Sequence, residues 1–126
     1  MSEVTFYRCN KCGNLVAVVN KGACTPQCCG QPMEKLVPGS TDAATEKHVP
    51  VAVREGADVK VTVGSVEHPM LEEHWIQWIA LAQGDRVEIH HLHPGEKPET
   101  VFASVAEGPA TVYEYCNLHG LWKCEL

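Results

Sequence analysis

The sequence predicts a mainly β protein in which a small metal-binding module precedes a larger antiparallel β-sandwich. Five of the seven cysteines lie in the first 36 residues, a stretch with few large apolar side chains. From about residue 49 onward, short segments rich in β-favouring residues follow one another, separated by turn sequences. The stretch VPGSTDAATEK between these regions is small, polar and rich in turn formers. These observations predict domains at 1–36 and 48–126, joined by a linker at 37–47.

The composition and the net charge indicate where the protein is located and which kinds of partner it disfavours. Modules below roughly 40 residues usually depend on a metal, disulfides or oligomerisation. Seven cysteines is an odd number for a disulfide framework, and MSEVTFYRCN lacks the pattern of a signal peptide. We therefore expect a reducing, cytoplasmic location. The net charge of −6 makes nucleic acid and anionic membranes poor partners, and no apolar run approaches the roughly 20 residues of a membrane span.

The second region is expected to contain about seven short strands. In VKVTV the apolar residues Val59, Val61 and Val63 alternate, as a half-buried strand requires. The expected strands are 49–54, 59–63, 72–82, 86–93, 99–105, 110–115 and 121–126. This number and spacing indicate a β-sandwich of immunoglobulin-like size. A helix in HPMLEEHWIQWIALA (68–82) is the main competing local interpretation, because its apolar residues do not settle the period.

The cysteines of the first region form two pairs. Cys9 and Cys12 are a Cys-x2-Cys pair, and Cys28 and Cys29 are adjacent after fifteen intervening residues. A disulfide between neighbours is strained, because bridge geometry prefers Cα atoms roughly 5.5 Å apart. Four thiolates instead suit a closed tetrahedral site for zinc or for a single iron. Backbone amides of the Cys-x2-Cys loop are expected to donate to the sulfurs, and Cys24 is expected to be a free thiol.

Potential ligands also occur in four loops of the second region. They are His48 in EKHVP, His68 in EHPM, His74 in EEHW, and Cys116 with His119 in EYCNLHG. Each lone histidine is more often a surface residue than a ligand. Cys116 and His119 are a stronger signal, since a two-residue spacer lets a thiolate and an imidazole reach one ion.

Three further histidines form a rival cluster in the segment HHLH. His91 and His93 would share one face of a strand, from which two imidazoles can chelate a metal. A solvated strand face is the preferred interpretation of His90, His91 and His93. Cys124 near the end of the chain is expected to be a bystander.

Specific motifs nevertheless connect the chain to a known family. FYRCNKCGNLVAVVN followed by CCGQPMEKL closely resembles the small iron module desulforedoxin, over residues 1 to 36. EKHVPV, HPM-x3-HW and YCN-x-HG-x-WK resemble the signature of superoxide reductases, and the sandwich region resembles neelaredoxin. The whole chain resembles the two-iron desulfoferrodoxin family.

The resemblance implies two mononuclear irons with separate ligand sets. One iron would be held by Cys9, Cys12, Cys28 and Cys29. The catalytic iron would have four equatorial histidines and one axial cysteine, which here are His48, His68, His74, His119 and Cys116. Beside the catalytic iron, Lys47 would offer positive charge and Glu46 would move onto the ferric ion after product leaves.

The implied function is superoxide reduction in defence against oxidative stress. Superoxide, two protons and one electron would give hydrogen peroxide without forming dioxygen. A rubredoxin-type protein would return the electron, and the chain would form a homodimer. The alternatives are a rubredoxin-like electron-transfer protein, which leaves the histidines of the second region unused, and a zinc-binding interaction module, which would be colourless.

Overall fold

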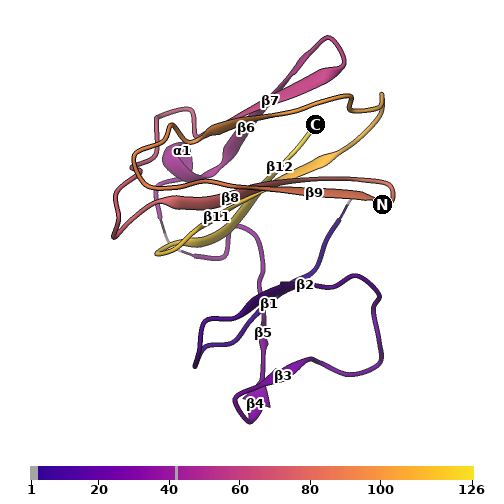
Figure 1. Ribbon diagram of the computed structural model, residues 1–126, viewed down its shortest axis with the longest axis vertical. Coiled ribbons are helices and arrows are strands. Elements are labelled where there is room, and N and C mark those ends of the chain that lie inside the picture. The colour runs from indigo at the N-terminus through magenta and orange to yellow at the C-terminus, as the bar shows by residue number, and fades with distance from the viewer. Residues whose placement is uncertain (1–2, 42) are drawn as a thin grey trace. The chain divides into compact units, whose positions relative to one another are not determined.

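The computed structural model describes residues 3–41 and 43–126, and the chain divides into two compact units. The first unit, Val4–Val37, contains five very short strands. Their bounds are β1 Phe6–Arg8, β2 Leu15–Ala17, β3 Gln27–Cys28, β4 Gln31–Pro32 and β5 Glu34–Lys35. Strands β2, β1 and β5 form one antiparallel sheet in that order, and β3 pairs with β4 as a hairpin (Figure 1).

The second unit, which contains Pro38–Leu126, is a sandwich of seven strands. The strands are β6 Pro50–Glu55, β7 Asp58–Val63, β8 Ile76–Gln83, β9 Arg86–His91, β10 Glu99–Phe102, β11 Thr111–Cys116 and β12 Gly120–Glu125. One antiparallel sheet has the order β10-β7-β6, and the other has the order β12-β11-β8-β9. The two sheets form two layers in Figure 1, with the short helix α1 (Thr45–His48) at one end. The predicted sandwich class is confirmed.

The core between the sheets follows the predicted alternation. Val59, Val61 and Val63 of β7 are all essentially inaccessible, and the intervening residues of the strand are not. They pack against Ile79 of β8 and Phe102 of β10 in one buried apolar cluster. Burial of apolar side chains on the inner faces of both sheets therefore holds the sandwich together.

The segment from His68 to Trp75 is not helical, so the competing helical interpretation is wrong. Leu71 and His74 instead form an isolated bridge, with reciprocal backbone hydrogen bonds of 2.8 and 3.0 Å. Strand β8 begins only at Ile76, which leaves the preceding residues as a loop. A tight turn therefore carries His74, and the β-favouring residues that follow it form the strand.

A single helical turn replaces the end of the expected linker. In α1 the backbone N–H of Val49 donates to Thr45 O at 2.9 Å, and Val49 itself is extended. The extended conformation follows from Pro50, because a proline disfavours helical geometry in the residue before it. His48 is consequently the last residue of a helical turn rather than a loop residue. No helix among the described residues has the length and apolar character of a membrane span.

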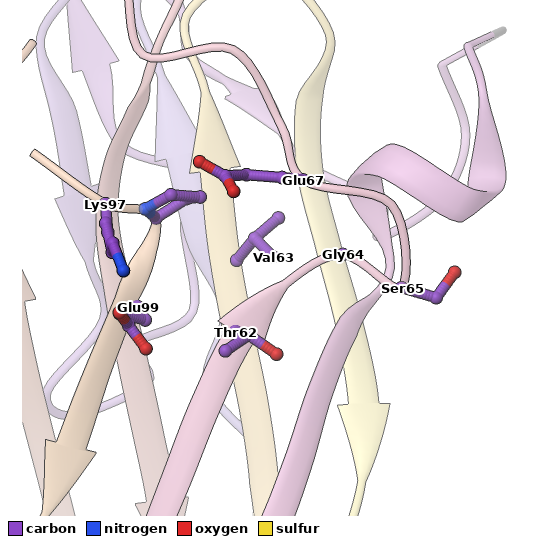
Figure 2. A pocket seen from close by; sticks show the side chains of 8 residues that line it. Thr62, Val63, Gly64, Ser65, Glu67, Lys97 and Glu99 are labelled. Atoms are coloured by element: carbon purple, nitrogen blue, oxygen red, sulfur yellow. The ribbon is translucent and has the colours of Figure 1, made fainter. Parts of the chain in front are cut away.

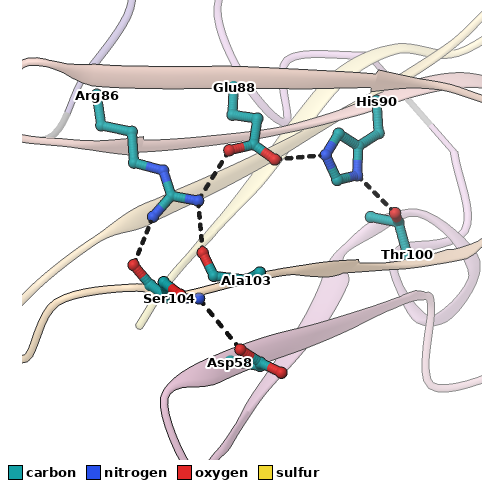
Figure 3. Close-up of polar contacts among 7 residues, drawn as sticks. All are labelled: Asp58, Arg86, Glu88, His90, Thr100, Ala103 and Ser104. Atoms are coloured by element: carbon teal, nitrogen blue, oxygen red, sulfur yellow. Dashed lines mark hydrogen bonds and ion pairs between the residues drawn. The ribbon is translucent and has the colours of Figure 1, made fainter.

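A polar network connects the edge strands β9 and β10, which belong to different sheets. The carboxylate of Glu88 lies between the side chains of Arg86 and His90 (Figure 3). Arg86 Nη2 is 2.8 Å from one carboxylate oxygen, and His90 Nε2 is 2.6 Å from the other. His90 Nδ1 lies 2.7 Å from the Thr100 hydroxyl of β10, and the His90 ring stacks on Phe102. The network therefore crosses from one layer of the sandwich to the other.

Replacing Glu88 with glutamine should weaken this connection. The Arg86 guanidinium, followed by His90, holds the pKa of Glu88 below its usual 4.5. We expect the free energy of unfolding to fall by about 0.5 to 1 kcal/mol at neutral pH, since an exposed carboxylate is partly screened by water. A depressed carboxyl pKa contributes stability above the unfolded value, and that contribution is lost as pH falls through the folded value. The difference between the proteins should thus shrink below about pH 4.

Urea unfolding monitored by tryptophan fluorescence measures this difference, because all three tryptophans lie in the second unit. Glu107→Gln removes an exposed carboxylate from the loop before β11 and serves as the matched control. Equal losses for the two variants at every pH would contradict the role of the network.

Candidate metal centres

Four cysteines of the first unit converge on one point. The sulfur atoms of Cys9, Cys12, Cys28 and Cys29 all lie within 4.8 Å of one another. The backbone N–H of Cys12 donates to Cys9 Sγ at 3.4 Å, as expected for a Cys-x2-Cys loop. Cys29 has a positive φ of 53° and the next residue, Gly30, one of 74°, so the backbone turns sharply at the adjacent pair. This turn lets two neighbouring sulfurs face the same point.

The electrostatics of this group call for a cation. The N–H of Cys12 is the main cause that lowers the pKa of Cys9 to about 6, whereas the sulfurs of Cys12, Cys9 and Cys28 raise that of Cys29 to about 12. None of the four is in a disulfide. Four ionised sulfurs this close repel one another unless a positive ion lies among them. The donor set fits zinc or a mononuclear iron.

Five residues of the second unit form another such group. Their ligand atoms also lie within 4.8 Å of one another, and they come from four separate segments. His48 ends α1, His68 and His74 lie in the loop between β7 and β8, Cys116 ends β11, and His119 lies in the turn before β12. Tertiary folding therefore brings together the five residues that the sequence motifs had indicated.

The hydrogen bonds of two histidines fix where their lone pairs point. His48 Nδ1 donates to the carbonyl of Ala44 at 2.8 Å, and His68 Nδ1 donates to the carbonyl of Pro69 at 2.7 Å. A carbonyl only accepts, so in a neutral ring the Nε2 atom then carries a lone pair. The two Nε2 atoms lie 3.1 Å apart, with no hydrogen to share between neutral rings. A cation between them satisfies both.

The remaining donors face the same point. His119 places Nδ1 at 3.1 Å from His48 Nε2 and at 3.9 Å from Cys116 Sγ. His74 Nε2 is buried and has no hydrogen-bond partner, which is costly for a polar atom. The centre therefore offers the nitrogen donors of four imidazoles and one sulfur.

Burial favours the neutral form of His48, His68 and His74, as metal ligation requires. Desolvation lowers the pKa of His48 and His74, and it lowers that of His68 to about 4. Desolvation also raises the pKa of the inaccessible Cys116 thiol, although backbone N–H groups of Leu118 and His119 oppose this. A cation beside the sulfur would favour its thiolate form. Four nitrogens and a thiolate are unusual for structural zinc, which is almost always four-coordinate, and fit a five-ligand iron.

A tryptophan holds two of the ligand segments together. The indole of Trp122 lies 5.2 Å from the His48 ring, measured between ring centroids, and its Nε1 donates to the carbonyl of His119 at 3.0 Å. Together with the carbonyls of Ala44 and Pro69, it orients the ligands from outside. These supports could not be found from the sequence, except that Trp122 belongs to the HG-x-WK motif.

The exposed residues Glu46 and Lys47 directly precede the ligand His48, and a backbone contact anchors their helical turn. The carbonyl of Glu46 accepts from the N–H of Val66 at 2.9 Å and from the Ser65 hydroxyl at 3.2 Å. A side chain at Gly64 would put its Cβ 2.5 Å from that carbonyl oxygen, so only glycine permits this approach. The segment 64–66 thus supports the helical turn that ends in His48.

The best-formed hollow of the second unit is separate from the ligand atoms. It measures about 310 Å³, and Val63, Glu67, Lys97 and Glu99 are among the residues that line it. Figure 2 shows Lys97 and Glu99 on one side and Glu67 on the other. None of the five ligand side chains lines it, so this hollow is not part of the metal centre.

The rival histidine cluster does not form. Strand β9 ends at His91, so His93 is not on the strand and the expected shared face is absent. His90 is engaged by Glu88 and Thr100, and His93 pairs with Glu96 at 3.2 Å. Cys24 is exposed and Cys124 is partly buried, and neither belongs to a described metal-ligand group.

Comparison with known proteins agrees with both centres. Residues 2–36 match the family model described as desulfoferrodoxin, N-terminal domain, and residues 40–125 match the model for desulfoferrodoxin. The desulfoferrodoxin of Syntrophotalea carbinolica is 50% identical over 123 residues, which are 98% of this chain and 97% of the relative.

Proteins named superoxide reductase are also similar. That of Pyrococcus horikoshii is 39% identical over 69% of this chain and 91% of its own length. The crystal structure of the superoxide reductase from Treponema pallidum matches with a TM-score of 0.77 and 34% identity, covering 97% of this chain and 98% of that one. With both domain models matched in order and half of its residues shared with a full-length relative, the chain belongs to the desulfoferrodoxin family.

Proposed function

We propose that this protein is a superoxide reductase with two mononuclear iron ions. The observation that carries the proposal is the convergence of His48, His68, His74, His119 and Cys116, with the ligand nitrogens of His48 and His68 fixed by carbonyls behind them. Five protein ligands leave room for one small molecule on an octahedral ion. The similarity to superoxide reductases supports superoxide as that molecule.

The reaction adds one electron and two protons to superoxide and gives hydrogen peroxide without dioxygen. When bound in this donor set, ferrous iron supplies the electron. The chain holds four imidazoles in place and excludes water from Cys116, which is inaccessible to solvent. A cysteine thiolate pushes electron density onto its metal, as in thiolate-ligated haem proteins.

Lys47 and Glu46 are proposed to serve the exposed side of the centre. Within the segments 44–49, 64–75 and 116–119, Lys47 is the single lysine or arginine, against four glutamates. Its charge attracts the anionic substrate where the protein as a whole, at −6, repels it. Glu46 would offer a carboxylate to the iron bound in this centre.

The electron donor, the location, the oligomeric state and the domain bounds are also part of the proposal. The electron comes from a rubredoxin-type donor, and the protein acts in the cytoplasm as a homodimer. The first iron module occupies 1–36, a linker 37–47 and the catalytic domain 48–126. A rubredoxin-like electron-transfer protein accounts for the four cysteines but leaves the five converging ligands of the second unit without a use, which favours the reductase.

Metal analysis tests the proposal directly. We expect two irons per chain, because the two donor groups are separate and each has a complete set of ligands. One should show the visible absorption of ferric iron bound by four sulfurs, and the other that of iron bound by nitrogens and one thiolate. A colourless protein with zinc in both centres would overturn the enzyme proposal.

Single substitutions should separate the two centres. Cys12→Ser should damage the first iron centre while the direct reaction of the second with superoxide stays within about threefold of wild type. Cys116→Ser should slow that reaction by at least about tenfold to a hundredfold, because it removes the thiolate. Pulse radiolysis and iron analysis measure both effects.

The exposed Cys24 lies in the same unit as Cys12 but outside the cluster, so Cys24→Ser is the matched control. If Cys12→Ser abolished the fast reaction while ferrous iron still filled the second centre, the assigned roles would be wrong.

Lys47→Met should slow capture of superoxide by about tenfold or more, within the range of electrostatic steering. The iron spectrum should stay nearly unchanged, because no ligand is lost. Added salt should slow the wild-type reaction and affect the variant less, since salt screens charges beyond about 8–10 Å. Pulse radiolysis over a range of ionic strength measures the rates.

Lys97→Met makes the same charge change in the loop before β10 and controls for net charge. Equal capture rates in Lys47→Met and wild type would show that Lys47 is only a solvated neighbour of His48. Glu46→Ala should spare the capture rate and alter the ferric spectrum.

A further inference from the structure

The ladder between β8 and β11 ends at the metal centre. Its last backbone pair joins Cys116 to Ile76, after an irregularity in register between Tyr115 and Cys116. Beyond this pair, β11 leads into the turn that carries His119, so its backbone departs from the line of the strand. The residues before Ile76, which include His74, therefore lie past the end of the regular ladder.

Asn117 takes over the pairing where the ladder stops. Its backbone N–H donates to the carbonyl of Trp75 at 3.3 Å. Its side-chain Oδ1 accepts from the N–H of Trp75 at 2.9 Å, and its Nδ2 donates to the carbonyl of Glu73 at 3.0 Å. One amide side chain thus binds both peptide groups that flank the Cα atom of His74. The amide supplies an acceptor and a donor side by side, whereas an ionised carboxylate only accepts.

His74 depends on such backbone support more than its neighbours do. The rings of His48 and His68 are oriented by carbonyls that accept from Nδ1. Among the described residues, no hydrogen bond of this kind holds the His74 ring, and its buried Nε2 has no partner. The direction of the ring therefore follows from the backbone at 73–75. Leu71 holds that backbone from one side through the 71–74 bridge, and Asn117 holds it from the other.

We propose that Asn117 is a positioning residue that sets His74 against Cys116 and His119. It follows Cys116 directly, so the same turn that presents the thiolate also fixes the loop that presents the imidazole. The consequence of this inference for catalysis rests on the proposed function. The inference itself concerns the affinity of the second centre for a metal ion.

A double-mutant cycle with Co²⁺ as the probe tests this. In full-length protein, Asn117→Ala should weaken Co²⁺ binding at the second centre by about 10- to 100-fold, the usual effect of losing a residue that orients a ligand. Asn117→Asp keeps the acceptor for Trp75 but loses the donor to Glu73, so its loss should be smaller. Chelator competition followed by tryptophan fluorescence reports on the second unit, which contains all three tryptophans.

The cycle asks whether Asn117 acts through His74. In a His74→Ala background, Asn117→Ala should change the Co²⁺ affinity by no more than about twofold, because the ligand that it positions is already absent. The matched control is Gln83→Ala, since Gln83 also uses its side-chain amide to bridge backbone segments, donating to Ala106 O at 2.8 Å. Gln83→Ala should leave the affinity unchanged even where it lowers the thermal stability.

The inference would be overturned if Asn117→Ala bound Co²⁺ as tightly as wild type. It would also be overturned if Asn117→Ala lost the same Co²⁺ affinity in the wild-type and the His74→Ala backgrounds. If Asn117→Ala does not fold, the same cycle is run with Asn117→Asp, and the same two outcomes decide. Failure of the wild-type protein to react with superoxide would overturn the proposed function instead and leave the Co²⁺ result standing.

Discussion

The metal centre of the second unit depends on one constraint, which is that buried nitrogen lone pairs and a sulfur must face a common point. The Nε2 atoms of His48 and His68 lie 3.1 Å apart, and each is aimed by a backbone carbonyl behind the ring. In an apolar interior such an arrangement is unfavourable without a cation. The sandwich tolerates it because each ligand segment starts from a rigid strand end, a helical turn or a tight bridge.

The supports around the centre come from backbone groups as much as from side chains. The carbonyls of Ala44 and Pro69 fix the tautomers of His48 and His68. The carbonyl of Glu46 connects α1 to the segment 64–66. Gly64 makes that last approach possible, since a Cβ there would meet the Glu46 carbonyl oxygen at 2.5 Å. Trp122 contributes in both ways, by packing against His48 and by donating to the backbone of His119. The ligands are thus oriented both by backbone carbonyls and by particular residues such as Gly64 and Trp122.

The two centres solve the problem of metal binding differently. In the small unit, two short loops bring four sulfurs together, and the crowding of like charges makes a cation part of the folded state. In the sandwich, an apolar core that includes Val59, Val61, Val63, Ile79 and Phe102 borders the centre, since Cys116 belongs to the same cluster. The metal there adds chemistry to a domain with its own apolar core. The spacing of the cysteine pairs alone therefore predicted one metal site. The scattered histidines were recognised as one ligand set only through the family motifs.

The sequence by itself determined the class of the sandwich and its seven strands, its separation from a cysteine-rich region, and the nine candidate metal ligands of the two centres, but not the groups that support these ligands. These predictions rest on local patterns, namely the alternation of Val59, Val61 and Val63 and the spacing of the cysteines. Local patterns can be recognised in the sequence alone. The tertiary structure decided that 68–75 forms a bridge rather than a helix, that β9 stops before His93, and that Asn117 completes the ladder beside His74. The bridge and the strand end depend on particular backbone hydrogen bonds, which no periodicity encodes, and Asn117 binds residues that lie more than 40 positions away in the chain.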